Sequence, residues 1–245
     1  MSMQGYIHSI ETMGTMDGPG LRYVIFMQGC PLRCAFCHNP DTWRMACGQV
    51  KTVDWLIEDI KNYVSYFKFS GGGVTVSGGE PLLQAAFISQ LFQGLKKLNI
   101  HRVVDTSGFA EVENIKGLMA LTDMVMLSIK HPDPEIHREI CGHSQERPLA
   151  FARYLNKINM PVWIRYVLIP RVSNSSKDLT MLADMIKNFP NVQKLELLPY
   201  NTMGKSKWQE LGIKSDLLDS PSPNPQEVED ARQLMSNLLP NIKII

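Results

Sequence analysis

The sequence has 245 residues, with 25 Lys or Arg and 24 Asp or Glu, so its formal net charge is +1. That balance argues against a general attraction to nucleic acid, and the apolar runs fall short of the roughly 18 residues that a membrane span needs. Five cysteines are an odd number in a chain much larger than a disulfide-rich module, and no secretory leader pattern opens the sequence. We therefore expect a protein of the reducing cytoplasm with one domain, residues 1–245, and with no nucleic-acid or membrane partner.

Short β-rich runs alternate with longer helical patterns, which predicts an α/β protein with a parallel sheet and covering helices. The predicted strands are residues 21–27, 74–77, 102–106, 124–129, 162–169 and 194–198. The predicted helices are residues 53–67, 85–98, 112–121, 149–159, 177–188 and 225–238. Six strand and helix pairs are too few for the closed eight-stranded barrel. We expect an open partial (β/α)6 barrel, with residues 242–245 as a candidate edge strand.

Three cysteines, Cys30, Cys34 and Cys37, follow the first predicted strand with the spacing C-x3-C-x2-C. Three thiolates on one short loop can hold three irons of a four-iron, four-sulfur cluster, which leaves the fourth iron open to a small ligand. The alternative is a zinc site in which His38 completes a Cys3His set. Structural zinc sites usually take their ligands as two separated pairs. Because the other two cysteines stand alone, the pattern favours the cluster.

A glycine-rich stretch, residues 70–81, spans the second predicted strand and the turn after it. Interior glycines weaken a strand unless a ligand or another backbone comes close, so the stretch predicts a bound ligand. Dinucleotide binding is a weaker interpretation because the G-x-G-x-x-G order that opens a helix is missing. Loops after successive strands gather at one edge of an α/β barrel. We therefore expect the cysteine loop, the glycine-rich stretch and residues 105–108 to converge.

Two basic residues lie in or just after later predicted strands. Lys130 follows the fourth strand, where it could pair with a carboxylate as a point charge, although a lone lysine is usually solvated. Arg165 lies inside an otherwise apolar fifth strand, and a buried guanidinium needs an anionic or carbonyl partner. For Arg165 a ligand contact and a structural salt bridge are equal alternatives.

The cysteine spacing and the glycine-rich motif resemble those of the radical S-adenosylmethionine enzymes, in which S-adenosylmethionine chelates the open iron of a 4Fe-4S cluster. Nearly the whole chain is similar to the pyruvate formate-lyase activating enzymes, which install a glycyl radical on a large partner enzyme. The segments that carry this likeness are residues 5–9, 14–22, 37–43, 105–109, 162–166 and 197–208. Most activators of other glycyl-radical enzymes carry an inserted ferredoxin-like module. Here only residues 44–51 occupy that place, so the resemblance is to the single-cluster branch.

The resemblance implies that Cys30, Cys34 and Cys37 hold the cluster and act in catalysis. It also implies that a ring at Phe36 lies near the adenine and that backbone groups of residues 78–80 receive the amino group of the methionine moiety. The cofactor-binding set that we carry over is Phe36, His38, Gly78, Gly79, Glu80, Thr106, Ser128, Lys130, Arg165 and Asn201.

Two residues depart from the family pattern. Ser128 stands where the family has an aspartate that, together with the aspartate at the position of Asp105, holds a monovalent cation beside the cofactor. Losing a carboxylate weakens an oxygen-rich cation site, so we expect weaker cation activation or a site completed by the Ser128 hydroxyl and water. Asn201 replaces a histidine, and its amide can keep a hydrogen bond but no protonation role.

The implied activity is one-electron cleavage of S-adenosylmethionine to a 5′-deoxyadenosyl radical, which takes hydrogen from a glycine of pyruvate formate-lyase. A flavodoxin or ferredoxin would donate the electron, and a monomer is the default. We expect Asp17, in the loop of residues 14–20, to accept hydrogen bonds from the partner's glycine loop; the alternative is a tight turn that Asp17 caps. The other functions left open are activation of a different glycyl-radical enzyme, a radical reaction on a small substrate, and a zinc-binding interaction protein.

Overall fold

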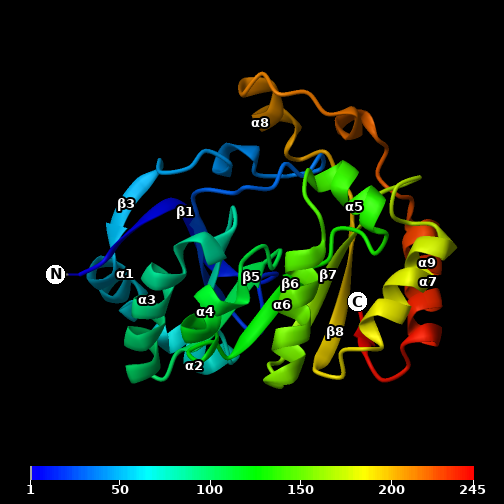
Figure 1. The fold of residues 1–245 in the computed structure, drawn as a ribbon. Coiled ribbons are helices and arrows are strands. Elements are labelled where there is room, and N and C mark those ends of the chain that lie inside the picture. Colours follow the sequence, from blue (N-terminus) through cyan, green and yellow to red (C-terminus); the bar gives the residue numbers. More distant parts are fainter. Residues whose placement is uncertain (1) are drawn as a thin grey trace. The chain divides into compact units, whose positions relative to one another are not determined.

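The computed structural model describes residues 2–245, so the first residue of the predicted domain lies outside the described chain. The chain groups into two compact units, which Figure 1 traces in sequence order. The first unit comprises the chain up to Pro31 together with Thr42–Met126, and the second comprises Leu32–Asp41 together with Leu127–Ile245. The strand β6 (Met124–Ser128) therefore begins in the first unit and ends in the second. No helix among residues 2–245 is both long and apolar enough to cross a membrane.

The first unit contains a mixed sheet. Its strands are β1 (Gln4–Gly14), β2 (Arg22–Met27), β3 (Gln49–Thr52), β4 (Gly73–Gly78) and β5 (His101–Thr106), in the order β3-β1-β2-β4-β5. β1 pairs antiparallel with β2 and β3, whereas β2, β4 and β5 run parallel to one another. The helices of this unit are α1 (Val53–Lys61), α2 (Val64–Ser70), α3 (Ala85–Lys97) and α4 (Val112–Met119), with a short 3-10 helix, η2 (Pro81–Gln84), after β4.

The two faces of this sheet differ in chemistry because successive strand residues point to opposite sides. Tyr23 faces the helices, since its hydroxyl donates a hydrogen bond to Asp59 of α1 at 2.5 Å. Its neighbours in β2 therefore face the other way, and the register places Thr75 and Ser77 of β4 on that same opposite face. The parallel core of the first unit thus has an apolar helix-covered face and a second face with buried polar groups.

The second unit also contains parallel strands. β7 (Val162–Leu168) pairs with β8 (Val192–Pro199), which pairs with β9 (Lys243–Ile244). The helices are α5 (Pro134–Cys141), α6 (Glu146–Lys157), α7 (Ser176–Ile186), α8 (Lys205–Glu210) and α9 (Pro225–Leu238). α7 and α9 pack side by side, as Figure 1 shows in yellow and red, and α9 also contacts β8 and β9.

The structure confirms all six predicted strands to within about two residues at each end, and the candidate edge strand is β9. The predicted helix 53–67 is wrong as a single element, because α1 ends at Lys61 and α2 begins at Val64. Between them the amides of Asn62 and Tyr63 bond to carbonyls three residues back, and this tighter turn ends the α-helical pattern. The strands β1 and β3 and the helices α5 and α8 were not predicted from the sequence.

The strand β1 was missed because its alternation is irregular. Its pairing with β2 shifts register twice, between Ile7 and Ser9 and between Glu11 and Gly14. Each shift adds a residue that breaks the two-residue period on which strand recognition depends.

Candidate functional site

The first cysteine lies at the end of β2 in the first unit. The chain leaves the strand through Gly29, whose φ of 99° is a conformation that side chains disfavour. The amide of Gly29 donates to the carbonyl of Thr42 at 2.7 Å, and that of Cys30 donates to the carbonyl of Trp43 at 3.3 Å. Cys30 is buried. The start of the cysteine loop (residues 29–41) is therefore held in place by main-chain hydrogen bonds.

The later part of the cysteine loop belongs to the second unit, where it contacts the end of α5. The amides of Arg33 and Ala35 donate to the carbonyls of Cys141 and Ile140, at 2.9 and 2.8 Å. Helix ends leave carbonyls without partners inside the helix, and the loop amides supply these partners. The two later cysteines are buried and half-buried, respectively.

The donor set of the loop fits an iron–sulfur cluster. Among the described residues no cysteine forms a disulfide, so the thiols remain available as thiolates. The amide of Asn39 points at the sulfur of Cys37 at 3.4 Å, a contact that favours the thiolate. Among residues 2–245 no three His, Cys, Asp or Glu side chains are grouped tightly enough for a single metal ion. A cluster does not need such grouping, because each thiolate binds a different iron.

Two of the predicted cofactor residues in the second unit lie together. The Nζ atom of Lys130 is 5.7 Å from the centroid of the buried Phe36 ring. The residue before the lysine, Ile129, donates its amide to the carbonyl of Arg165 at 3.0 Å. This hydrogen bond fixes the end of β6 to β7. Lys130 and Phe36, the predicted contacts of the carboxylate and the adenine of S-adenosylmethionine, therefore lie next to each other.

Arg165 forms an ion pair with a residue that the sequence analysis did not select. Its Nε atom donates to Glu196 of β8 at 3.1 Å, and the other oxygen of that carboxylate accepts from Lys194 at 2.8 Å. The lysine also lies 3.5 Å from the centre of the Trp163 ring, a cation–π contact. Glu196, like Arg165, is a charged residue within a strand and is 6% exposed, so the need of a buried charge for a partner would have pointed to it as well.

His38 and Asn201 also meet within the second unit. The Nε2 atom of His38 lies 3.1 Å from the main-chain oxygen of Asn201, which can only accept a hydrogen bond. Nε2 therefore carries the proton. The side-chain oxygen of Asn201 accepts from the amide of Met203 at 3.1 Å and so stabilises the turn after β8.

Glu80 in the first unit has a fully engaged carboxylate. One oxygen accepts from the hydroxyl of Thr106 and from the amide of Leu82, and the other accepts from both the amide and the hydroxyl of Ser107. Burial raises the pKa of Glu80, and the four hydrogen bonds offset this only in part. The Glu80 side chain thus joins the loops after β4 and β5. That main-chain groups of residues 78–80 bind the cofactor stays a prediction.

The glycines before Glu80 allow a close approach of backbone segments. A Cβ atom on Gly79 would lie 2.3 Å from the carbonyl oxygen of Gly29, and one on Gly78 would lie 2.2 Å from the amide of Met27. Real side chains are excluded at such distances. These glycines bring β4's end against the start of the cysteine loop, within the first unit.

The two predicted cation ligands lie at the ends of different strands. Asp105 in β5 accepts a hydrogen bond from the hydroxyl of Ser77 at 2.7 Å. Ser128 is the last residue of β6 and is half-buried. Their roles as cation ligands stay predictions.

Asp17 lies in the loop before β2, at the strand end opposite to Cys30. The carbonyl of Asp17 accepts from the hydroxyl of Thr75 at 2.6 Å, and Arg22 donates to the same hydroxyl at 2.9 Å. Arg22 is fully buried and also donates to the carbonyl of Pro19. Burial lowers the pKa of Arg22 to about 10, although the nearby charge of Asp17 acts to raise it. The loop is thus fastened to the polar face of the first unit's sheet.

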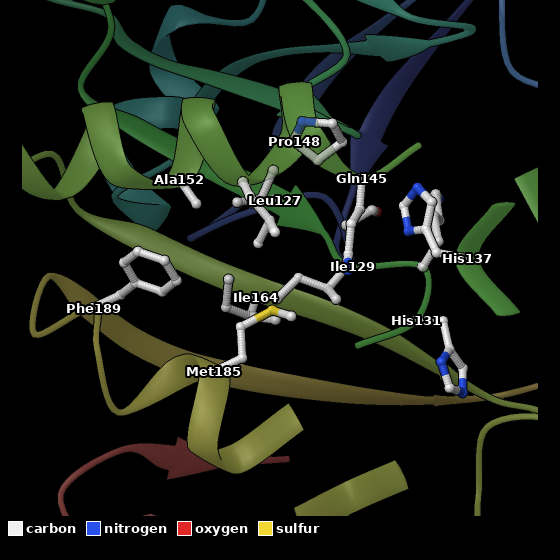
Figure 2. A pocket seen from close by; sticks show the side chains of 13 residues that line it. Leu127, Ile129, His131, His137, Gln145, Pro148, Ala152, Ile164, Met185 and Phe189 are labelled. Carbon is white, nitrogen blue, oxygen red and sulfur yellow. The ribbon is translucent and has the colours of Figure 1, made fainter. Parts of the chain in front are cut away.

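A pocket in the second unit is lined by Lys130 and mainly by apolar side chains, which come from β6, α6, β7 and α7 and the residues that follow them. Figure 2 shows His137 and Gln145 at one end and Phe189 at the other. His137 is 3% exposed, and neither ring nitrogen has a hydrogen-bond partner among the described residues. Burial lowers its pKa to about 4, which the nearby main chain of His131 offsets only in part.

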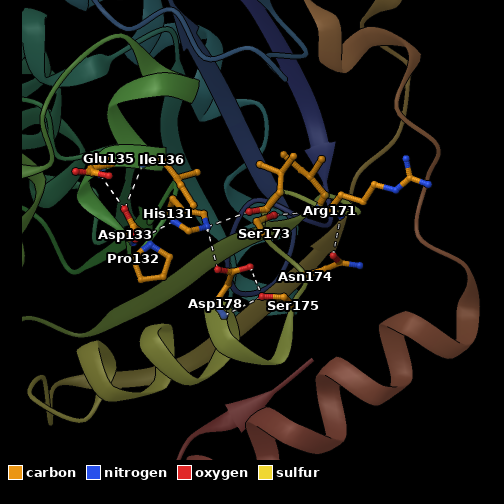
Figure 3. Close-up of polar contacts among 12 residues, drawn as sticks. His131, Pro132, Asp133, Glu135, Ile136, Arg171, Ser173, Asn174, Ser175 and Asp178 are labelled. Atoms are coloured by element: carbon orange, nitrogen blue, oxygen red, sulfur yellow. Dashed lines mark hydrogen bonds and ion pairs between the residues drawn. The ribbon is translucent and has the colours of Figure 1, made fainter.

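His131, the residue after Lys130, is fully buried and anchors the start of α5 (Figure 3). Its Nδ1 atom accepts from the amide of Asp133 at 3.0 Å, and Nε2 lies 3.1 Å from the carbonyl of Val172. Nε2 therefore carries a proton, with Asp178 at 3.7 Å. The side chain of Asp133 then caps α5 by accepting from the amides of Glu135 and Ile136. This anchor was missed because Val172 and Asp178, two of the three partners of His131, lie about 40 residues further along the chain.

The sequence of this chain also matches known proteins. The model of the Radical SAM superfamily matches residues 24–183. Curated relatives called pyruvate formate-lyase-activating enzyme include one from Staphylococcus epidermidis, 45% identical over 236 residues, and one from Staphylococcus aureus, 44% identical. Each alignment covers 94% of this chain and 94% of the relative.

Solved structures with a similar fold include a domain of a pyruvate-formate lyase-activating enzyme from Bacteroides vulgatus. It has a TM-score of 0.59 and 25% identity, and the match covers 71% of this chain and 98% of that one. A radical SAM methyltransferase from Sphaerobacter thermophilus matches with a TM-score of 0.67 and 16% identity, over 98% of this chain and 76% of that one. The second likeness concerns the fold alone. Both agree with the open α/β architecture of this chain.

Proposed function

The chain belongs to the radical SAM superfamily and, within it, to the family of pyruvate formate-lyase-activating enzymes, and we propose that it makes a radical on a glycine of a pyruvate formate-lyase. The observation that best supports this proposal is the 45% sequence identity to the relative from Staphylococcus epidermidis, over 94% of this chain and 94% of the relative. The resemblance drawn from the sequence, its open α/β fold and its 4Fe-4S and S-adenosylmethionine cofactors are thereby confirmed. The zinc-binding interaction protein is no longer the competing interpretation.

Cys30, Cys34 and Cys37 would hold the cluster through three thiolates. When bound, the reduced cluster and S-adenosylmethionine supply a 5′-deoxyadenosyl radical. The protein's own part is to orient the cofactor and to keep water and other hydrogen donors away. The buried positions of Cys30 and Cys34 suit this task.

The second unit would bind the polar end and the ring of S-adenosylmethionine. We assign the cofactor's carboxylate to Lys130 and a contact with its adenine to Phe36, because the two side chains already lie next to each other. Arg165, held by Glu196, adds a second cation in the same unit. His38 and Asn201 would contact the nucleoside side, and their mutual hydrogen bond sets the orientation of the imidazole.

The first unit would contribute main-chain acceptors of residues 78–80 for the amino group of the cofactor's methionine moiety. Thr106 supports them through Glu80. We assign the cation, if one binds, to Asp105 with help from the Ser128 hydroxyl. A site with a single carboxylate binds a monovalent cation more weakly than a site with two.

The substrate is a glycyl-radical enzyme, as the names of the relatives imply. Hydrogen transfer requires the target carbon to be in van der Waals contact with the radical, so a peptide loop of that enzyme must reach the cofactor. Asp17, which precedes β2 at the end opposite to Cys30, stays the acceptor that the sequence predicts for the peptide's main-chain amides. A flavodoxin or ferredoxin as electron donor, a monomeric state, a single domain and a cytoplasmic location complete the proposal.

The test is reconstitution of the protein with iron and sulfide without oxygen, followed by reduction and addition of S-adenosylmethionine. We expect 5′-deoxyadenosine to form and, with a pyruvate formate-lyase present, a glycine radical to be seen by electron paramagnetic resonance in matching amount. A Cys34→Ser variant is the control that should lose both signals. Formation of 5′-deoxyadenosine without a glycine radical would contradict the proposed partner and favour another glycyl-radical enzyme or a small substrate.

A further inference from the structure

The segment after β8, residues 201–215, is here called the clasp because it contacts the cysteine loop repeatedly. It contains the short helix α8 and no residue of the strands. The indole Nε1 of Trp208 donates to the carbonyl of Cys37 at 2.7 Å. The hydroxyl of Ser215 donates to the carbonyl of Ala35, also at 2.7 Å. Both contacts lie within the second unit, and their partners are more than 170 residues apart in sequence.

Two further contacts use charge and the imidazole. Lys207 donates to the side-chain oxygen of Asn39 at 2.8 Å and forms an ion pair with Asp41 at 3.0 Å. At the start of the clasp the carbonyl of Asn201 accepts from His38. Five of the seven residues from 35 to 41 of the cysteine loop are therefore bonded to the clasp, namely Ala35, Cys37, His38, Asn39 and Asp41.

The clasp also fits the loop sterically. A Cβ atom on Gly204 would lie 2.8 Å from the Cα atom of His38 and 3.2 Å from the carbonyl oxygen of Cys37. Trp208 is 2% exposed, so its indole is packed as well as hydrogen-bonded. The carbonyl of Cys37 is part-buried, so loss of this donor would leave it with an incompletely compensated desolvation cost.

These contacts reach the atoms that would hold the cluster. The amide of Asn39 points at the sulfur of Cys37, and Lys207 holds the side chain of the same asparagine. Hydrogen bonds to cluster sulfurs and nearby charges set the reduction potential of an iron–sulfur cluster. Outer contacts of this kind also determine how tightly a metal group is held.

We propose that the clasp is a positioning element for the cluster: Trp208, Ser215 and Lys207 hold the loop of Cys34 and Cys37 in its cluster-binding form and set the amide bond from Asn39 to sulfur. The inference rests on the cluster assigned under the proposed function. It adds to that function three residues, Trp208, Ser215 and Lys207, that are assigned neither to S-adenosylmethionine nor to the partner.

The test uses the full chain, loaded with cluster without oxygen, in four single variants. Trp208→Phe and Ser215→Ala each remove one donor, and Lys207→Met removes the charge next to Asn39. Trp55→Phe is the matched control, because that tryptophan lies on α1 in the first unit and is 44% exposed. The readouts are the rate of iron release to a chelator, the electron paramagnetic resonance spectrum of the reduced cluster and its reduction potential.

We expect Trp208→Phe and Ser215→Ala to release iron about 3- to 10-fold faster than the parent, the range that loss of one hydrogen bond implies. Lys207→Met should lower the reduction potential, because a positive charge near the cluster stabilises its reduced form. Trp55→Phe should match the parent in all three readouts.

Unchanged iron release in both Trp208→Phe and Ser215→Ala would overturn the proposal. If Trp208→Phe does not fold, Ser215→Ala decides the outcome, because it deletes one oxygen and leaves the packing intact. The clasp proposal and the proposed function can fail independently of each other. A parent protein that holds its cluster and cleaves S-adenosylmethionine, yet activates no pyruvate formate-lyase, would refute the partner and leave the clasp measurement valid.

Discussion

Glu80 accepts four hydrogen bonds on its two carboxylate oxygens, so a neutral isostere cannot replace it. Glu80→Gln would turn one acceptor into an amide that faces two donors. We expect the free energy of unfolding to fall by about 2–3 kcal/mol, the cost of buried donors left unpaired. Thr106→Val removes one donor to Glu80 and also the acceptor of the Gly108 amide, and it should cost about 2 kcal/mol. Urea unfolding of the two variants checks this, and a Glu80→Gln protein as stable as the parent would show that the carboxylate is not required.

Glu196 determines the orientation of the guanidinium of Arg165 through its Nε contact. In Glu196→Gln the charge partner is lost while size and shape remain. If Arg165 binds S-adenosylmethionine, we expect the KM for this cofactor to rise about 3- to 10-fold with little change in kcat, since a ground-state contact is weakened. Lys194→Met, which removes the second cation on the same carboxylate, is the matched control with a smaller effect. A drop in kcat at constant KM would argue against this role.

At the scale of elements, α5 connects the end of β6 to the cysteine loop. Asp133 caps its N-terminus, and its last carbonyls accept from the amides of Arg33 and Ala35. Asp133→Ala should lower the free energy of unfolding, because the amides of Glu135 and Ile136 lose the side chain that caps the helix. Because the helix holds the loop, those two amides should also exchange hydrogen faster, as measured by mass spectrometry.

The control for this variant is Ser175→Ala, which removes the N-cap of α7. That helix end has no hydrogen bond to the cysteine loop among those described. Equal protection of Arg33 and Ala35 in the parent and in Asp133→Ala would mean that α5 does not support the loop.

At the scale of the whole molecule, buried histidine makes stability depend on pH. His137 has a folded-state pKa of about 4 because it is buried, whereas its unfolded value is near 6.5. The unfolded chain therefore binds more protons between these values, so stability is complete above pH 6.5 and is lost as pH falls towards 4. We expect a loss of up to about 2 kcal/mol between about pH 7 and about pH 5.

Urea unfolding across this range measures the effect, with His137→Gln as the comparison, because this variant cannot titrate. Burial also lowers the pKa of His101, so part of the slope should remain in His137→Gln. An identical slope in the parent and in the variant would assign the pH dependence to other groups.

Local sequence determined much of this protein. The cysteine spacing and the order of strands and helices are local patterns, and the bounds of α9 follow from Asn224, which caps the helix, and Pro225 at its start. The signals for α5 were also present, since Asp133-Pro134 precedes it and Gly142 ends it. Such features depend on a few neighbouring residues, and these act through backbone geometry and short-range hydrogen bonds.

Only the tertiary structure decided which distant groups meet. Trp208 donates to Cys37 across 171 residues of sequence, and Glu196 faces Arg165 from the neighbouring strand. Nor does sequence distinguish a carboxylate that binds a ligand from one, such as Glu80, whose hydrogen bonds are all used inside the protein. The physical reason is burial: a polar side chain removed from water takes whichever partner the packing provides, and packing is a property of the folded chain.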